Sequence, residues 1–300
     1  LRFRAVLDGP PGPIDRPLAA VPRTARPPEP EDSAPLPTLE WLDDHTAYLV
    51  VPTFSNSRFR AVGATFFEAI HDIFVELEQR GARDLILDIR ENGGGSEPNE
   101  SILFSYLVEE PLRKYAAVEA RGGRLSITSL SGRLYEVEVF DADDPDRQRP
   151  IGGGRLTRRN TPPHGLMSRW TTFEPVYRGR LVVLAGGYTF SGGAELASML
   201  RRTHRAVFVG EEVGGAHEGN TSGYFWRLEL PNSGMKIRIP LLQFRLAWSS
   251  RPHGRGVLPD CPAQPRADEF GIRRDRAWRM GVALFDQDWR VPRQAVCSSV

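Results

Sequence analysis

Three short runs of consecutive apolar residues constrain the fold of this chain most strongly. They are Leu85–Ile89 (LILDI), Arg180–Ala185 (RLVVLA) and Ala206–Gly210 (AVFVG), and each has the length of a buried strand. The first belongs to a unit of strand, helix, strand, glycine loop and helix, and the other two enclose a helix. The sequence therefore predicts an α/β fold, a core of β-sheet with flanking helices.

The other predicted elements complete this core. The segment Val62–Leu77 carries apolar residues at helical spacing, and Arg80-Gly81 ends it. A turn sequence, PNSG, separates two strand-like runs and predicts a hairpin. The remaining expected elements are a strand at Ala47–Val51, helices at Ile102–Val108 and Gly192–Arg201, and the two hairpin strands at Tyr224–Leu230 and Met235–Leu241.

Proline marks the beginning of the chain. Residues 9–37 contain PPGP, RPPEPED and APLP with few large apolar residues to bury, which predicts an extended linker. Leu1–Leu7 (LRFRAVL) alternates like a strand and is expected to be the remnant of an upstream module. The expected organisation is a strand and Pro-rich linker at 1–40, a core at 41–265 with an insertion or flap at 121–172, and a C-terminal extension packing on the core at 266–300.

Composition excludes several classes of protein. Thirty-nine basic and 38 acidic residues give a net charge of +1, so no global field favours nucleic acid. No run of about 18 apolar residues could span a bilayer as a helix. Cys261 and Cys297 are the only cysteines, and either one bridge or two free thiols fits them. A start at Leu1 without a leader is expected of a processed or trimmed chain.

Ser191 is the candidate nucleophile. It stands where a strand ends and a helix begins, in GYTFSGGAE, and a helix N-terminus favours the negative charge of an alkoxide and its tetrahedral adduct. The amide of Gly192 can donate to an oxyanion. A plain helix N-cap is the alternative for this serine. Thr189 stands where the G-x-S-x-G elbow needs its first glycine, which excludes that motif.

Two further residues accompany the serine. Gly94, in the triplet after LILDI, can supply a second oxyanion amide, and a plain tight turn is the alternative. Pro98 occupies the place of the last glycine of a dinucleotide fingerprint, so that motif is excluded. Glu195 lies four residues after Ser191 on the same helix face. It can orient a base or a substrate amine, or merely complement the helix dipole.

Five segments in this order indicate a protein family much more specifically than any of these residues alone. They are LILDIRENGGG, RLVVLAGGYTFSGGAEL, RAVFVGEEVGGAHEG, LPNSGMKIRIP and GRGVLPD. From about Ala47 to Asp260 the chain resembles peptidase family S41, the C-terminal processing or tail-specific proteases. The resemblance implies a core like that of the ClpP and crotonase folds, with Ser191 as nucleophile and the amides of Gly192 and Gly94 as oxyanion hole. It also implies a peptide or unfolded-protein substrate laid along a strand edge, with no metal or cofactor required.

The chain departs from that family at the general base. C-terminal processing peptidases have a lysine where this chain has Ala216, which excludes a Ser/Lys dyad at that position. The segment GGAH resembles instead the tricorn-like and retinoid-binding branches. Histidine titrates near neutrality, so we predict His217 as the base and His253 as the next candidate. A histidine upstream of Leu1, or no base at all, remains open. Structural roles are expected for His71, on the predicted helix, and for His204, at a helix end, while His45 and His164 lie in polar contexts with no partner pattern.

The leading prediction is hydrolysis of peptide bonds through an acyl-enzyme on Ser191, in an extracytoplasmic (periplasmic or secreted) protein. Two alternatives remain open. The first is a catalytically inactive binding protein on the S41 fold, motivated by the missing lysine. The second is an acyl-CoA enzyme of the related crotonase fold, which needs no serine at position 191. The sequence indicates neither the natural substrate nor the oligomeric state.

Overall fold

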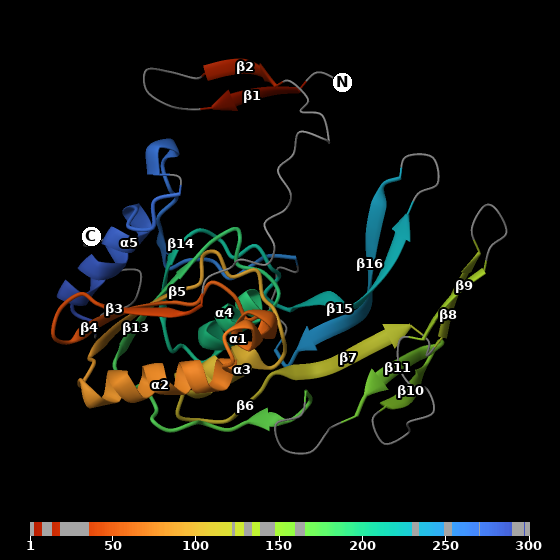
Figure 1. Ribbon diagram of the computed structural model, residues 1–300, viewed down its shortest axis with the longest axis horizontal. Coiled ribbons are helices and arrows are strands. Elements are labelled where there is room, and N and C mark those ends of the chain that lie inside the picture. Colours follow the sequence, from red (N-terminus) through yellow and green to blue (C-terminus); the bar gives the residue numbers. More distant parts are fainter. Residues whose placement is uncertain are drawn as a thin grey trace.

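A six-stranded sheet forms the centre of the molecule (Figure 1). The computed structural model describes residues 3–7, 14–18, 36–121, 124–128, 134–138, 148–159, 166–229, 234–248, 254–269, 271–289 and 297. The strand order is β17 (Cys261–Pro262), β14 (Val207–Gly210), β13 (Arg180–Ala185), β5 (Asp84–Asp88), β4 (Thr46–Val50) and β3 (Thr38–Trp41). All neighbours are parallel except β3 and β4. The four strands predicted from apolar runs are therefore confirmed as β4, β5, β13 and β14.

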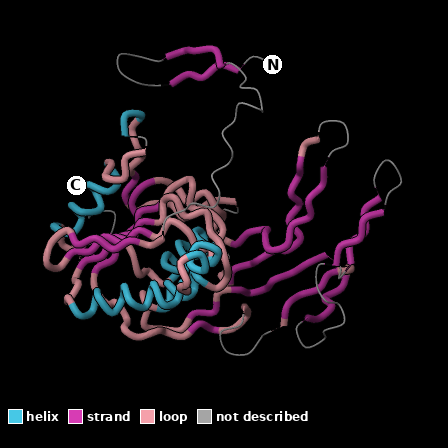
Figure 2. Tube along the Cα trace, in the orientation of Figure 1, coloured by secondary structure: helices cyan, strands magenta, loops and turns pink. Residues whose placement is uncertain are grey.

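Helices cover both faces of this sheet. Alternate residues such as Leu85 and Leu87 are fully buried towards one side, and Ile86 is fully buried towards the other. Burial on both faces explains why these strands are continuous apolar runs. The first side carries α2 (Phe66–Gln79), α3 (Asn99–Ser105) and α4 (Gly192–Arg202), and the second carries α5 (Arg276–Ala283). Figure 2 shows the helices gathered around this sheet.

The helix predicted from Val62 begins at Phe66 instead. Thr65 caps it, because the Thr65 hydroxyl accepts from the Glu68 amide while the Glu68 carboxylate accepts from the Thr65 amide. A separate short helix, α1 (Asn56–Ala61), precedes it and was not predicted. The helices predicted at Ile102–Val108 and Gly192–Arg201 are present as α3, which begins and ends three residues earlier, and as α4.

A second, antiparallel sheet extends away from the first (Figure 1). Its order is β10 (Gln148–Gly152), β11 (Arg155–Arg158), β7 (Tyr115–Arg121), β16 (Lys236–Leu246) and β15 (Gly219–Glu229). The predicted hairpin is confirmed as β15 and β16, although both strands are longer than expected. Its turn at 230–233 lies outside the described residues. β15 is the edge strand of this sheet.

Several strands lie where the sequence indicated little regular structure. β10 and β11 belong to the region expected to be an insertion, yet they extend the antiparallel sheet beside β7. β2 (Ile14–Leu18) pairs with β1 (Phe3–Leu7) inside the segment expected to be a linker, and Pro17 is compatible with a strand that has one free edge. Two small pairs complete the strands: β6 (Leu112–Arg113) with β12 (Arg169–Trp170), and β8 (Arg124–Thr128) with β9 (Leu134–Glu138).

The C-terminal residues are fastened to the central sheet. A disulfide joins Cys261 of β17 to Cys297, so of the two possibilities for the cysteines the bridge is the one present. Two 3-10 turns, Ala267–Glu269 and Leu284–Asp286, flank α5. Within the described part of the chain, no helix combines the length and the apolar character needed to cross a membrane.

Candidate active site

Ser191 occupies a strained position between β13 and α4. Its φ is 49° and its ψ is −123°, a backbone conformation that residues other than glycine rarely adopt. Such strain costs on the order of 1–3 kcal/mol and clusters at functional sites. Ser191 precedes the first residue of α4, but its side chain makes no capping hydrogen bond to the helix. The Ser191 hydroxyl therefore does not act as a plain helix N-cap in this structure.

Hydrogen bonds fasten the serine loop to the end of β5. The Thr189 hydroxyl donates to the Ile89 carbonyl at 2.8 Å and accepts from the Gly186 amide at 3.1 Å. The Phe190 amide donates to the Asn92 carbonyl at 3.0 Å. Thr189 and Asn92 are both fully buried. Thr189, which in the sequence only excluded a hydrolase elbow, thus holds the loop that carries the candidate nucleophile.

Gly94 lies directly against Ser191. A β-carbon built on Gly94 would stand 2.6 Å from the β-carbon of Ser191 and 2.9 Å from the Gly192 nitrogen, and the φ of Gly94 is +96°. Only glycine fits such a position. The predicted proximity of Gly94, Ser191 and Gly192 is therefore real. The Gly94 amide donates to the Asn92 side-chain oxygen at 2.8 Å, so in this conformation it is engaged within its own loop.

Ser191, Gly192 and Glu195 line a cavity of about 570 Å³. Its walls are built by the glycine loop with α3, the first turn of α4, the loop after β14, the edge strand β15, and residues of β7 and β16. Other lining residues are Gly93, Gly95, Glu97, Glu100, Tyr115, Phe190, Gly214, Gly215, Ala216, Gly219, Asn220, Thr221, Ser222, Gly223, Phe225, Arg238 and Phe244. The cavity therefore joins the candidate nucleophile to a free strand edge.

A buried lysine organises one wall of this cavity. The Lys114 ammonium lies 2.6 Å from Glu97 and 2.6 Å from Glu195, and it also bonds Glu100. An ammonium has three N–H donors, so each carboxylate can receive one. Lys114, Glu100 and Glu195 are almost completely buried, whereas Glu97 is partly exposed. We call these four residues the Lys114 cluster. The ammonium stands where three carboxylates would otherwise suit a metal ion.

The Lys114 cluster carries more negative than positive charge. Burial raises the pKa of Glu100 to about 7, and the charge of Glu97 adds to this while Lys114 opposes it. Burial also raises the pKa of Glu195, again against Lys114. Burial alone would lower the pKa of Lys114, but the three carboxylates outweigh it and raise that pKa, so the lysine stays charged. Burial thus favours the protonated forms of Glu100 and Glu195, whereas the Lys114 ammonium favours their charged forms.

The comparison with known protein families settles the class of this fold. A sequence model of peptidase family S41 matches residues 45–263, the greater part of the chain. The chain belongs to peptidase family S41. No curated protein matches the chain closely enough to add to this.

Two solved structures share the fold of this S41 chain. A putative peptidase from Parabacteroides merdae is 17% identical with a TM-score of 0.53, and the match covers 83% of this chain and 64% of that one. Mature CPAF complexed with lactacystin is 16% identical with a TM-score of 0.52, over 99% and 67% of the two chains. This S41 chain therefore spans about two thirds of the length of these relatives.

The histidine predicted as base contacts α4 about two turns beyond the candidate nucleophile. His217 Nδ1 lies 3.2 Å from the hydroxyl of Ser198, and burial lowers the pKa of His217. Ser198 is seven residues beyond Ser191 on α4, which corresponds to about 10 Å along the helix axis. His217 is not among the residues that line the cavity. The prediction of His217 as base finds no support in this arrangement.

None of the other described histidines lines the cavity of Ser191. His71 Nδ1 lies 3.0 Å from the Tyr106 hydroxyl, on α2. Among the described residues, no histidine lines the Ser191 cavity. His164 and His253 lie outside the described residues. The proton-accepting side chains that do reach this cavity are carboxylates, and sequence reasoning missed two of them, Glu97 and Glu100.

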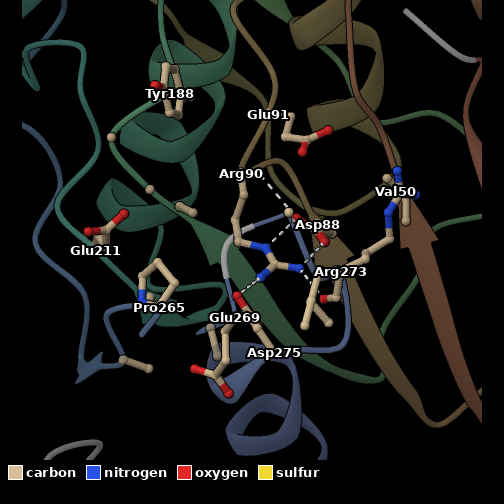
Figure 3. Close-up of a pocket in the computed structure, with 18 of the residues that line it drawn as sticks. Val50, Asp88, Arg90, Glu91, Tyr188, Glu211, Pro265, Glu269, Arg273 and Asp275 are labelled. Atoms are coloured by element: carbon tan, nitrogen blue, oxygen red, sulfur yellow. Dashed lines mark hydrogen bonds and ion pairs between the residues drawn. The ribbon is translucent and has the colours of Figure 1, made fainter. Parts of the chain in front are cut away.

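A second cavity of about 260 Å³ lies at the carboxyl ends of β4, β5, β13 and β14 (Figure 3). Gly187 and Tyr188 line it, so the serine loop borders both cavities. The guanidinium of Arg90 donates to Asp88 at 2.7 and 3.0 Å and to Asp275 at 2.7 Å. Asp275 also caps α5 by accepting from the Trp278 amide. We call Arg90, Asp88 and Asp275 the Arg90 cluster.

Proposed function

We propose that this S41 peptidase hydrolyses peptide bonds through an acyl-enzyme on Ser191. The observation that carries the proposal is the strained, uncapped serine at the start of α4, packed against Gly94 at the end of a cavity. The serine oxygen attacks the peptide carbonyl, and its proton passes to a base and then to the leaving amine. Water then releases the acyl group by the reverse sequence.

The oxyanion would be held by backbone amides at the same turn. The Gly192 amide heads α4, where the helix dipole favours negative charge. Gly94 is the second donor in this proposal, and its amide must exchange the Asn92 oxygen for the oxyanion. Both amides lie beside the serine, because a β-carbon on Gly94 would be 2.9 Å from the Gly192 nitrogen.

The substrate is an extended peptide that adds to the free edge of β15. This strand is at the edge of its sheet, and residues 219–223 line the cavity of the nucleophile. A peptide paired with such an edge gains main-chain hydrogen bonds independent of its side chains. Its carbonyl would then be carried towards Ser191.

Glu100 is the base that the cavity favours. A general base works best when its pKa lies near the operating pH, and burial raises the pKa of Glu100 to about 7. One Glu100 oxygen lies 3.4 Å from the position of a β-carbon on Gly192, so the carboxylate is next to the nucleophile turn. His217 would first have to leave Ser198.

Replacement of the nucleophile tests the proposal. Ser191→Ala should lower hydrolysis of an unstructured protein such as casein by about a thousandfold or more, with the fold retained. Full turnover by a folded Ser191→Ala protein would refute it. A peptide-binding protein without hydrolysis is the second candidate, favoured by the lack of a histidine in the described lining of the cavity. Wild-type protein that binds casein peptides without cleaving them would establish that candidate.

An extracytoplasmic location belongs to the same proposal. The Cys261–Cys297 disulfide supports it, because such bridges persist in oxidising compartments and are rare in the cytosol.

A further inference from the structure

A chain of hydrogen bonds crosses the wall of the cavity from the nucleophile helix to the edge strand. The Asn220 side-chain nitrogen donates to Glu195 Oε1 at 2.6 Å. The Ser222 hydroxyl donates to Asn220 Oδ1 at 2.5 Å. The other Glu195 oxygen receives the Lys114 ammonium at 2.6 Å and the Tyr115 hydroxyl at 2.7 Å. Glu195 thus connects α4, one turn beyond Ser191, to the first residues of β15.

The bond between Glu195 and Asn220 is strong for its kind. It joins a carboxylate to a neutral donor, and charge-assisted hydrogen bonds are shorter and stronger than neutral ones. Glu195 is 4% exposed, so water cannot readily replace Asn220 as its donor. Removal of the Asn220 amide would therefore leave an unsatisfied acceptor in the wall rather than a solvated one.

The geometry of β15 confines this connection to the part of the strand beside Ser191. Asn220 and Ser222 alternate along the strand, so their side chains lie on one face, and both line the cavity. The register with β16 shifts between Ser222 and Phe225, and Gly223 has a φ of +72°. A bulge of this kind bends a strand. The segment before the bulge is thus the one whose distance from α4 is fixed by Glu195.

We propose that Asn220 is a positioning residue, which through Glu195 holds the edge of β15 at the distance from Ser191 that an extended peptide requires. The inference rests on the proposed binding of substrate along β15. Asn220 does not touch the reacting atoms. Its effect is on where the peptide lies, and the intrinsic reactivity of Ser191 is independent of it.

Two measurements separate positioning from reactivity and from folding. The first is the affinity of a fluorescein-labelled casein peptide for protein carrying Ser191→Ala, which removes turnover from the measurement. The second is the rate at which a small fluorophosphonate labels Ser191 in otherwise wild-type protein, since this probe needs no strand edge. Thermal unfolding is followed for every variant. Gln243→Ala is the matched control, because Gln243 is exposed on β16 opposite Thr221 and does not line the cavity.

Asn220→Ala should weaken peptide affinity about tenfold, and Asn220→Asp should weaken it further because a second carboxylate then faces Glu195. The labelling rate should stay within about twofold of wild type, and Gln243→Ala should change neither value. Unchanged peptide affinity in Asn220→Ala overturns the inference. So does a parallel fall of affinity, labelling and unfolding temperature, which would indicate a purely structural role, and so does wild-type protein that binds no casein peptide.

Labelling by the fluorophosphonate and cleavage of casein test the proposed peptidase function independently of Asn220. Protein that is never labelled and never cleaves casein contradicts the peptidase proposal. Peptide affinity that still depends on Asn220 in that protein would nevertheless support the positioning role, in a binding protein.

Discussion

The Arg90 cluster and the Lys114 cluster both place one cation among buried carboxylates, but they differ in how many carboxylates share that cation. Around Arg90, neutral donors complete the set: the Tyr48 hydroxyl bonds Asp88 at 2.6 Å, and the Trp278 amide bonds Asp275 at 3.0 Å. Around Lys114, the Tyr115 hydroxyl and the Asn220 side chain likewise donate to Glu195, but three carboxylates share one ammonium, and burial raises the pKa of Glu100 to about 7. The Arg90 cluster joins the C-terminal residues to β5, whereas the carboxylates of the Lys114 cluster line the cavity of Ser191.

The difference in carboxylate number indicates different roles for the Arg90 cluster and the Lys114 cluster. The Arg90 cluster pairs one guanidinium with two carboxylates and braces one part of the chain against another. The Lys114 cluster has a larger excess of carboxylates, and strongly raised pKa values of buried groups cluster at functional sites. We therefore expect variants of the Arg90 cluster to change stability and variants of the Lys114 cluster to change activity as well.

Removal of each cation gives the largest contrast. Lys114→Met should lower casein hydrolysis by about a hundredfold, because the carboxylates that border Ser191 lose their common partner and shift. Arg90→Met should leave kcat/KM within about threefold of wild type. Both should lose on the order of 3–5 kcal/mol of stability, since each leaves buried carboxylates unpaired. Activity is measured on the fraction that is folded by circular dichroism.

The comparison breaks if folded Arg90→Met loses as much hydrolysis as Lys114→Met. Should Lys114→Met fail to fold, Glu195→Gln gives the same test without removing the cation. Hydrolysis should again fall strongly, because Glu195 contacts both Lys114 and Asn220.

A smaller effect is expected in the pH dependence of stability. The pKa of Glu100 is raised from 4.5 to about 7 in the folded protein, so the folded state holds a proton that the unfolded state releases. Its stabilisation is present below about pH 4.5 and is lost as the pH rises through about 7. Glu100→Gln should flatten the fall of the unfolding free energy over this window, by on the order of 1–3 kcal/mol.

Urea unfolding at a series of pH values measures this slope. The exposed Glu110→Gln serves as control and should leave it unchanged. The same series gives the pH profile of kcat/KM, which should lose its rise near neutrality in Glu100→Gln. A slope in Glu100→Gln identical to that of wild type would show that Glu100 does not carry the proton of the Lys114 cluster.

The smallest effect is expected at the predicted histidine. His217→Gln should keep kcat/KM within about threefold, because the imidazole contacts Ser198 and not the cavity. Stability should fall by about 0.5–1.5 kcal/mol for the lost hydrogen bond. Steady-state hydrolysis of casein peptides measures the first quantity. A loss of a hundredfold or more would return the role of base to His217 and assign the Lys114 cluster to structure alone.

The central sheet was predictable from sequence, whereas the wall of the site was not. Strands such as Leu85–Ile89 are buried on both faces and appear as unbroken apolar runs, but β10 and β11 lack such a run because they are short and polar. The positions of Ser191 and Gly94 could be predicted, because each follows the end of a predicted strand and lies in a glycine-containing loop. The Lys114 cluster could not be predicted, since Glu195 is distant in the sequence from Glu97, Glu100 and Lys114. Lys114 itself was a weak signal, as one of two lysines among 39 basic residues.

The direction of the His217 side chain was equally hard to predict. The position of the loop after β14 beside the site was foreseeable, because Gly214, Gly215 and Ala216 do line the cavity. The direction of the next side chain depends on the packing of that loop against α4, where Ser198 offers a hydrogen bond. Sequence separation carries no information on that direction.

Labelling of Ser191 tests the central claim most directly. Wild-type protein, incubated with a fluorophosphonate and digested, is analysed by mass spectrometry for the peptide that carries the adduct. The account predicts one adduct, on Ser191, with no labelling in Ser191→Ala and undiminished labelling in Ser198→Ala. Labelling at another serine, or none on protein that cleaves casein, would contradict Ser191 as the nucleophile.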